Sequence, residues 1–257
     1  MDLLVLKVTV TPLLMWLVSL TARKWGNLAG GLAAGLPISS GPISLYLALE
    51  HGAKFAEQAA LGSLVGLAAV ATTYIVYAIC LRLLLPPFCC MIALSIFIIL
   101  ALFIRELHIF FYVFMVFMSM ITIPGVTRPS TPSLQSMQPR PRWDMEARIF
   151  SSLILVLGTT SFARQLGPTL SGLLASIPVV AWPLIVFAHV QGGKDSAKAV
   201  IRGTMIGIPS VLIFYLVVYL WIAGAGIMKT YAMAFFISAL GAAGGLGLFF
   251  LSNRNQN

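Results

Sequence analysis

The chain contains two prolines five residues apart, with glycines and serines around them, and these residues could form a binding site. They are Pro37 and Pro42 in the segment 30–42, GGLAAGLPISSGP, which lies in a long apolar stretch. A proline inside a helix removes a backbone hydrogen bond and clashes with the preceding turn, at a cost of about 3 kcal/mol or more. In hydrocarbon, the freed backbone groups are tolerated only where protein or a water-filled cavity satisfies them. The spacing therefore predicts an unwound or kinked segment that could bind a ligand near the bilayer midplane.

A second stretch of the chain repeats this pattern. The segment 172–183 reads GLLASIPVVAWP, so Pro178 and Pro183 are again five residues apart. One constant shift in numbering, here called the repeat shift, carries Pro37 onto Pro178 and Pro42 onto Pro183. Without a gap, the repeat shift also aligns further identical residues: Arg23 with Arg164, Gly26 with Gly167, Gly31 with Gly172, Gly52 with Gly193, Ala56 with Ala197, Gly62 with Gly203, Gly66 with Gly207 and Tyr74 with Tyr215. Because glycine and proline fix backbone geometry rather than hydrophobicity, the match indicates a duplicated unit whose functional element is the broken segment.

The two broken segments differ in polarity. Half-helix amino termini at the breaks would present free amides and a positive dipole end, which suit carboxylate or phosphate groups. Serines follow the first break, whereas Ala181 and Trp182 follow the second, as an amphipathic substrate would need. The candidate substrate-binding residues are Gly35, Pro37, Ser39, Ser40, Gly41, Pro42 and Ser44 in the first segment and Ser176, Pro178, Ala181, Trp182 and Pro183 in the second. The alternative is that these are ordinary proline kinks of membrane helices.

Few titratable residues could couple or gate transport, because none of the seven acids lies near the middle of an apolar stretch. Glu50, Glu57 and His189 stand at the ends of such stretches and are the candidates for proton coupling. Arg23 and Arg164, which the repeat shift pairs, are candidate gates for an anion. The alternative is that the first three are solvated interfacial residues and that each arginine anchors a helix end.

Other functional classes lack their sequence signals. There is no HExxH, no GxSxG, no cluster of histidine with acids at ligand spacing and no carboxylate pair within an apolar stretch, so we expect neither an enzyme nor a metal or cofactor. The three cysteines have no paired spacing, which favours a packing role. The net charge is +9, but the basic residues lie in short loops and do not form a basic stripe with interleaved aromatic residues. This distribution argues against nucleic-acid binding.

The composition predicts an all-α polytopic membrane protein. Hydrophobic residues make up 60% of the chain and charged residues 9%, whereas a soluble domain has about a quarter of its residues charged. A membrane helix needs about 20 mostly apolar residues. Nine stretches approach that length, at 4–21, 28–49, 57–81, 86–104, 107–123, 147–163, 169–190, 203–223 and 230–251. Between the fifth and the sixth lies the segment 124–144, whose prolines and polar residues predict a linker without regular helix.

The repeat shift makes the first four stretches equivalent to the last four. An offset of five crossings is odd, so the second unit would be inverted relative to the first, with the fifth helix as connector. This divides the chain into a first membrane repeat (1–104), a connector helix with linker (105–146) and a second membrane repeat (147–257). With nine crossings, five Lys and Arg lie on the side of the N-terminus and eleven on the other. Since positive residues concentrate on the cytoplasmic side, we expect the N-terminus outside and the C-terminus in the cytoplasm.

An alternative topology makes each proline-rich segment a re-entrant hairpin. Seven crossings and parallel repeats would then remain, and the positive residues would divide seven against nine, so that the bias nearly vanishes. The nine-crossing topology with inverted repeats is therefore preferred. The N-terminus, MDLLVLKVTV, has no basic region before its apolar run and is expected to be a retained helix rather than a signal peptide.

Two motif pairs carry a family resemblance. AGLPISSGPISLYLALEHG is followed by GSLVGLAA, and SGLLASIPVVAWPLIVFAHVQGG by RGTMIGIPSVLIFYLVVY. Each unit resembles the small bacterial inner-membrane proteins called GlpM-like, most closely over 171–219. The resemblance implies a bacterial cytoplasmic membrane and supplies no substrate. Glycines four apart, as at Gly62 and Gly66, predict close helix packing and would also permit a homodimer.

Together these patterns favour a secondary-transporter-like protein in which a small anionic or amphipathic solute moves by alternating access between the two broken helices. Its partners would be the lipid bilayer and a small-molecule or lipid substrate. One alternative is a flippase or another lipid-handling protein for lipids or polyprenyl phosphates, with a groove that opens sideways to the bilayer. A second alternative is a non-transporting scaffold subunit, in which the kinks would pack tightly without a cavity.

Overall fold

The computed structural model describes residues 3–38, 40–104, 109–127 and 143–254. Within these ranges the chain forms helices and no strands. The helices are α1 (Leu3–Trp25), α2 (Asn27–Ala34), α3 (Ser40–His51), α4 (Ala53–Cys80), α5 (Pro86–Ile104), α6 (Ile109–Val126), α7 (Asp144–Ala175), α8 (Ala181–Ala225) and α9 (Ile227–Arg254). The all-helical fold expected from the composition is confirmed for this part of the chain.

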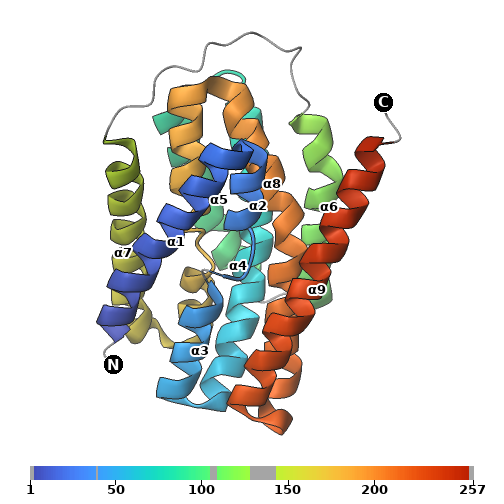
Figure 1. Ribbon diagram of the computed structural model, residues 1–257. Helices are drawn as coiled ribbons and strands as arrows, with labels where there is room; N and C mark the ends of the chain where they lie inside the picture. Colours follow the sequence, from blue (N-terminus) through green and yellow to red (C-terminus); the bar gives the residue numbers. More distant parts are fainter. Residues whose placement is uncertain (1–2, 39, 105–108, 128–142, 255–257) are drawn as a thin grey trace.

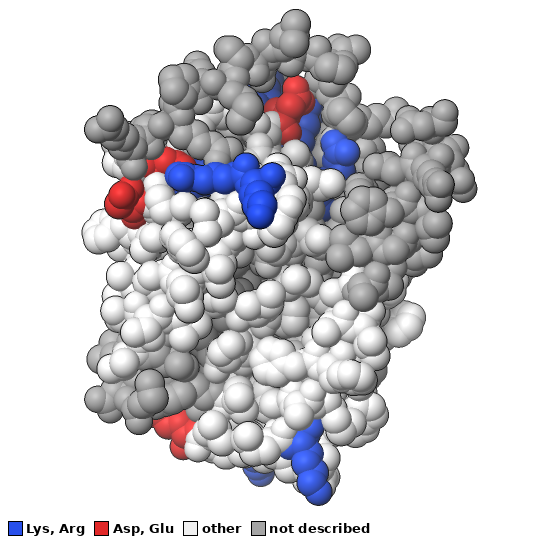
Figure 2. Space-filling model, viewed as in Figure 1, with Lys and Arg blue, Asp and Glu red and all other residues white. Residues whose placement is uncertain are grey.

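Three of these helices are long and apolar enough to cross a membrane, namely α4, α6 and α8. Shorter apolar stretches occur in α5, over Pro86–Ala101, and in α9, over Ile227–Ala242. Charged side chains gather near the two ends of the face in Figure 2, with a band of uncharged residues between them. These features are compatible with an integral membrane protein.

The helices form an elongated bundle (Figure 1). From the N-terminus, α1 runs toward the end of the bundle where α7 begins, and α2 and α3 then lead back toward the opposite end. α4 runs in the direction of α1, whereas α7 and the longer part of α8 run the other way. α2 packs against α8, and α4 packs against both α7 and α8, so α4 and α8 form the centre of the bundle.

Two glycines allow neighbouring helices to touch at backbone distance. A Cβ atom added at Gly203 in α8 would overlap the carbonyl oxygen of Leu28 in α2. A Cβ atom added at Gly62 in α4 would overlap the carbonyl oxygen of Thr169 in α7. The repeat shift carries Gly62 onto Gly203, and it also carries Leu28 onto Thr169. The repeat shift therefore relates the two helix contacts reciprocally. The glycine of one contact corresponds to the glycine of the other, and so do the two residues whose carbonyls they approach.

A second pair of glycine contacts follows the same rule. A Cβ atom added at Gly31 would overlap the Val200 carbonyl oxygen, and one added at Gly172 would overlap the Ala59 carbonyl oxygen. The repeat shift again relates the two glycines to each other and their two partners to each other. Four close backbone approaches thus arise from glycines that the repeat shift pairs, and the small-residue pattern predicted close packing for two of them, Gly62 and Gly203.

Sharp bends also occur at equivalent positions. Gly52, between α3 and α4, has a φ of 88°, and Gly193, where α8 bends, has a φ of 72°. Positive φ is readily adopted only by glycine, which explains why glycine stands at both turns.

The linker differs from its predicted bounds. Pro124 lies inside the last turn of α6 rather than in irregular chain, and the Thr127 amide continues the helical pattern by donating to the Ile123 carbonyl at 2.9 Å. One missing donor at Pro124 does not prevent the final turn from closing. The residues 128–142 of the predicted linker lie outside the described ranges.

Candidate functional site

Both proline-containing segments interrupt helices. α2 ends at Ala34 and α3 begins at Ser40, while α7 ends at Ala175 and α8 begins at Ala181. In each case the first proline lies in the interruption and the second lies in the first turn of the next helix. A proline in a first turn loses no hydrogen bond, because amides there have no helical acceptor. The five-residue spacing therefore ends one helix and permits the next, which confirms the predicted breaks.

The two interruptions share a pair of equivalent backbone hydrogen bonds. At each break, one bond closes the last turn of the first helix and another begins the next helix. Their donors and acceptors are Gly35 N to Gly31 O (2.9 Å) and Gly41 N to Pro37 O (2.9 Å) in the first, and Ser176 N to Gly172 O (3.1 Å) and Trp182 N to Pro178 O (2.9 Å) in the second. The repeat shift carries the donors and acceptors of these two bonds in the first break onto those in the second, so the two breaks begin and end in the same way.

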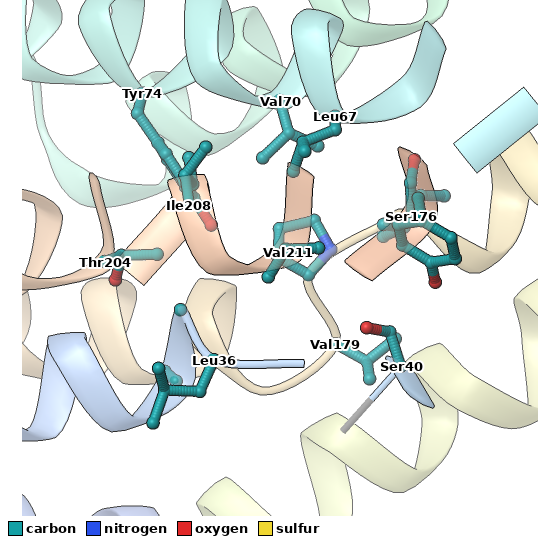
Figure 3. Close-up of a pocket in the computed structure, with 15 residues that line it drawn as sticks. Leu36, Ser40, Leu67, Val70, Tyr74, Ser176, Val179, Thr204, Ile208 and Val211 are labelled. Atoms are coloured by element: carbon teal, nitrogen blue, oxygen red, sulfur yellow. The ribbon is translucent and has the colours of Figure 1, made fainter. Parts of the chain in front are cut away.

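A cavity of about 60 Å³ lies between the two breaks and the central helices α4 and α8 (Figure 3). Its lining is symmetrical in sequence. The repeat shift relates five pairs of lining residues: Gly35 and Ser176, Leu36 and Ile177, Leu67 and Ile208, Val70 and Val211, and Tyr74 and Tyr215. The breaks thus come together around one shared space.

Three short hydroxyl side chains line this cavity, those of Ser40, Ser176 and Thr204. The Ser176 hydroxyl donates to the Leu173 carbonyl at 2.6 Å, and the Thr204 hydroxyl donates to the Val200 carbonyl at 3.0 Å. Because their protons are engaged within their own helices, Ser176 and Thr204 can offer a ligand only acceptor lone pairs.

Two tyrosines supply the remaining polar groups. Tyr74 of α4 and Tyr215 of α8 are each 1% exposed, and neither hydroxyl has a hydrogen-bond partner. Figure 3 shows the Tyr74 side chain extending from α4 toward Ile208. The Tyr215 hydroxyl lies beside the hydroxyls of Ser40 and Ser63 but in hydrogen-bonding geometry with neither. Since buried polar groups almost always find partners, two unpaired hydroxyls in one cavity indicate a ligand or ordered water.

Four of the predicted binding residues line the cavity: Gly35, Ser40, Ser176 and Pro178. Pro37, Pro42 and Pro183 shape the breaks. Gly41 packs closely against the Phe235 ring, and the Ser44 hydroxyl lies 2.8 Å from the Tyr231 hydroxyl of α9. Ser39 lies outside the described residues.

Ala181 and Trp182 are buried in the first turn of α8, but they are not among the residues that line the cavity. The aromatic groups there are the two tyrosines, and each break contributes a serine. The sequence signal for the tyrosines was present: Gly66, Val70 and Tyr74 recur at four-residue spacing and therefore lie on one helix face.

The coupling and gating candidates lie elsewhere. His189 is 7% exposed, and its Nδ1 atom is 3.3 Å from the Tyr77 hydroxyl. Glu50 is exposed near the end of α3, Glu57 lies in α4 near its start, and Arg23 contacts Asp144. The Arg164 side chain lies outside the described part of the structure. None of the four described candidates lines the cavity.

Asp144 is the centre of a buried polar network at one end of the bundle. Its carboxylate accepts hydrogen bonds from Arg23 at 3.0 Å, from Arg148 at 2.8 Å and from Gln191. Burial opposes ionisation of the carboxyl group, but the hydrogen bonds and the positive charge of Arg148 outweigh it and hold the Asp144 pKa below its usual value. The network joins α1, α7 and α8.

A second, apolar cavity of about 140 Å³ lies beside the first. Its lining comes from three places: Leu14, Leu17, Val18 and Thr21 of α1, Ala33 and Ala34 of α2, and Ile38 and Val180 of the breaks. Leu17 and Ile38 are 45% and 48% exposed, and Ala34 lines both cavities. The second cavity therefore adjoins the first and reaches the exposed side of α1.

Among the described residues, no group of three or more His, Cys, Asp or Glu side chains is placed to hold a metal ion. Comparison of the chain with protein-family models, curated proteins and solved structures found no match.

Proposed function

We propose that this chain is a secondary-transporter-like membrane protein that moves a small amphipathic or anionic solute by alternating access. The proposal rests on the cavity between the two breaks. Five pairs of residues related by the repeat shift line this cavity, and two of its buried hydroxyl groups have no hydrogen-bond partner. Transporter sites are commonly built from broken helices at the interface of two repeats. A scaffold subunit would be expected to pack its kinks without such a space.

The proposal includes two inverted repeats. The reciprocal contacts support it, because Gly203 meets Leu28 in the same way as Gly62 meets Thr169. Such an exchange of partners is what a two-fold relation between two units produces. The opposite directions of α1 and α7 in Figure 1 are consistent with an axis across the bundle rather than along it. In alternating access, the cavity would open toward one end of the bundle in one state and toward the other end in a second state. The two-fold axis would relate these two states.

Nine crossings follow if α2 and α3 together form one span, and the end of α7 with the start of α8 forms another. The membrane would then be a bacterial cytoplasmic membrane, as the GlpM-like resemblance implies, with the N-terminus outside. Reporter fusions after residues 25, 83, 135 and 194 should report the cytoplasm, and fusions after residues 52, 106, 167 and 227 should report the outside. Seven crossings would instead place residues 25 and 52 on the same side, which would remove the inverted repeats.

Lipid handling is the second candidate, and the apolar cavity beside α1 favours it. Its exposed residues would face acyl chains, and it lies next to the central cavity, with Ala34 in the lining of both. The first candidate predicts stabilisation by soluble solutes, whereas lipid handling predicts stabilisation by polyprenyl phosphates or other lipids.

A binding screen followed by transport tests the proposal. Thermal unfolding of the purified protein is measured with small organic acids and their neutral analogues, phosphorylated compounds and polyprenyl phosphates. Ser40→Leu fills the cavity and is expected to weaken binding of any stabilising compound at least about tenfold, or 1.4 kcal/mol. The matched control is Ser95→Leu, at an exposed position of α5. A compound that binds should also show counterflow in proteoliposomes. Binding that survives Ser40→Leu, or binding without counterflow, would reject the transporter.

A further inference from the structure

The central cavity has no charge to offer a solute. Its described lining consists of apolar side chains, glycine, proline and five hydroxyl-bearing residues, without Lys, Arg, His, Asp or Glu. An ion moved from water into such surroundings without a counter-charge loses far more solvation free energy than neutral hydrogen bonds return. The cavity therefore disfavours a solute that is charged when bound.

The hydrogen-bonding groups of the cavity fall into two kinds. Tyr74 and Tyr215 have hydroxyl protons without an acceptor, so they can donate to a solute. Ser176 and Thr204 already donate to carbonyls of their own helices, so they can only accept from it. A solute that satisfies both kinds must carry an acceptor and a donor. A primary amide has both on one carbon, and so does a protonated carboxylic acid, whereas a carboxylate has only acceptors.

The size of the cavity limits the rest of the molecule. A cavity needs about 10–15 Å³ to hold one water molecule. A cavity of about 60 Å³ therefore holds a solute of roughly four to six non-hydrogen atoms. Leu36, Ile177 and Val211 would surround its hydrocarbon part.

We infer that the solute is uncharged when bound: a compact amide or protonated short-chain acid whose carbonyl accepts from Tyr74 or Tyr215 and whose N–H or O–H donates to Ser176 or Thr204. This inference rests on the proposed function. It specifies that the anionic or amphipathic solute proposed above binds in its uncharged form. A solute that is an anion in water would then give up its charge by protonation before it enters the cavity.

Three compounds of similar length test whether the bound solute is charged. Butanamide, butyrate and butylammonium are compared by their effect on thermal unfolding of the full chain at pH 8. Butanamide is expected to raise the midpoint, and the two ions are not. Butyrate should become stabilising as the pH is lowered toward the pKa of the acid, when each sample is compared with a ligand-free sample at the same pH.

Three tyrosine variants test the contacts. At least one of Tyr74→Phe and Tyr215→Phe should weaken butanamide binding about three- to tenfold, as loss of one hydrogen bond does. They should leave the ligand-free midpoint unchanged or raise it, because each removes an unpaired buried hydroxyl. Tyr219→Phe, on the same helix as Tyr215 but outside the cavity lining, is the matched control and should bind as the parent protein does.

The outcomes separate the two claims. If butyrate at pH 8 stabilises the protein as well as butanamide does, and Ser40→Leu abolishes both effects, the neutral-solute inference is overturned and the transporter proposal stands. If butanamide binds both tyrosine variants as tightly as it binds the parent protein, the assigned contacts are wrong. If no probe stabilises the protein, the neutral-solute inference fails. If Ser40→Leu has no effect on a probe that does stabilise it, the cavity is not the binding site and both claims fail.

Discussion

Replacement of Gly203 by alanine should force α8 away from α2, and replacement of Gly62 should force α4 away from α7. At each position the added methyl group would meet a backbone carbonyl oxygen, that of Leu28 or of Thr169, and backbone cannot rotate aside as a side chain can. Overpacking of a close-packed interior typically costs about 1–3 kcal/mol. We expect the upper end of this range, about 3 kcal/mol, for both variants, since the two contacts are equivalent.

Two glycines in open positions provide the control. A Cβ atom added at Gly125 in α6 or Gly224 in α8 would meet nothing within 4 Å. Alanine at these sites is expected to leave stability unchanged or to raise it by up to about 1 kcal/mol, because it restricts the unfolded chain. The measurement is denaturant unfolding in mixed micelles. If Gly203→Ala is severe and Gly62→Ala is mild, the two units are not packed by a common contact.

The glycines and prolines made the fold partly predictable. Their geometric demands are local, so Pro37 with Pro42 was enough to predict an interruption between two helices. The repeat shift then indicated which distant residues should be equivalent. Gly62 and Gly203 were expected to pack closely, and both do. The repeat shift alone could not predict which residue each glycine contacts, because that depends on how the helices of the two units pack together.

The cavity was only partly predictable for the same reason. Ser40 and Ser176 lie in the breaks, and both line it. Tyr74 and Tyr215 lie on other helices, which reach the breaks only through tertiary packing. Their equivalence was visible in the sequence, but not their burial or the lack of hydrogen-bond partners. An unpaired hydroxyl is a property of the folded surroundings, so no local pattern could reveal it.

The Asp144 network was not predicted, because two of its members, Arg23 and Gln191, are distant from Asp144 in sequence. Asp144 is 121 residues from Arg23 and 47 from Gln191. From sequence, Arg23 was a candidate gate or a helix anchor. In the structure it pairs with an acid at the start of α7, which ties the end of α1 to the second half of the chain. This network should therefore contribute to the docking of the two halves.

Asp144→Ala should be among the most destabilising substitutions in the chain. The Asp144 side chain is 0% exposed and that of Arg148 is 6% exposed, so removal of the carboxylate breaks a buried ion pair from one side. Breaking a buried pair from one side costs about 3–5 kcal/mol. Glu146→Ala, two residues away and exposed, is the matched control and should change stability by less than about 0.5 kcal/mol.

Acidification tests the same network without truncation. Because the Asp144 pKa lies below its ordinary value of 3.8, the folded state favours the ionised carboxylate. The stability from this preference is complete above 3.8 and is lost as the pH falls through the lowered folded-state pKa. Asp144→Asn removes the titration, so the difference in stability between the parent and this variant should stay constant down to about pH 4 and shrink below it. A difference that already shrinks at pH 6, or that never shrinks, would mean that Asp144 is not held ionised by Arg23, Arg148 and Gln191.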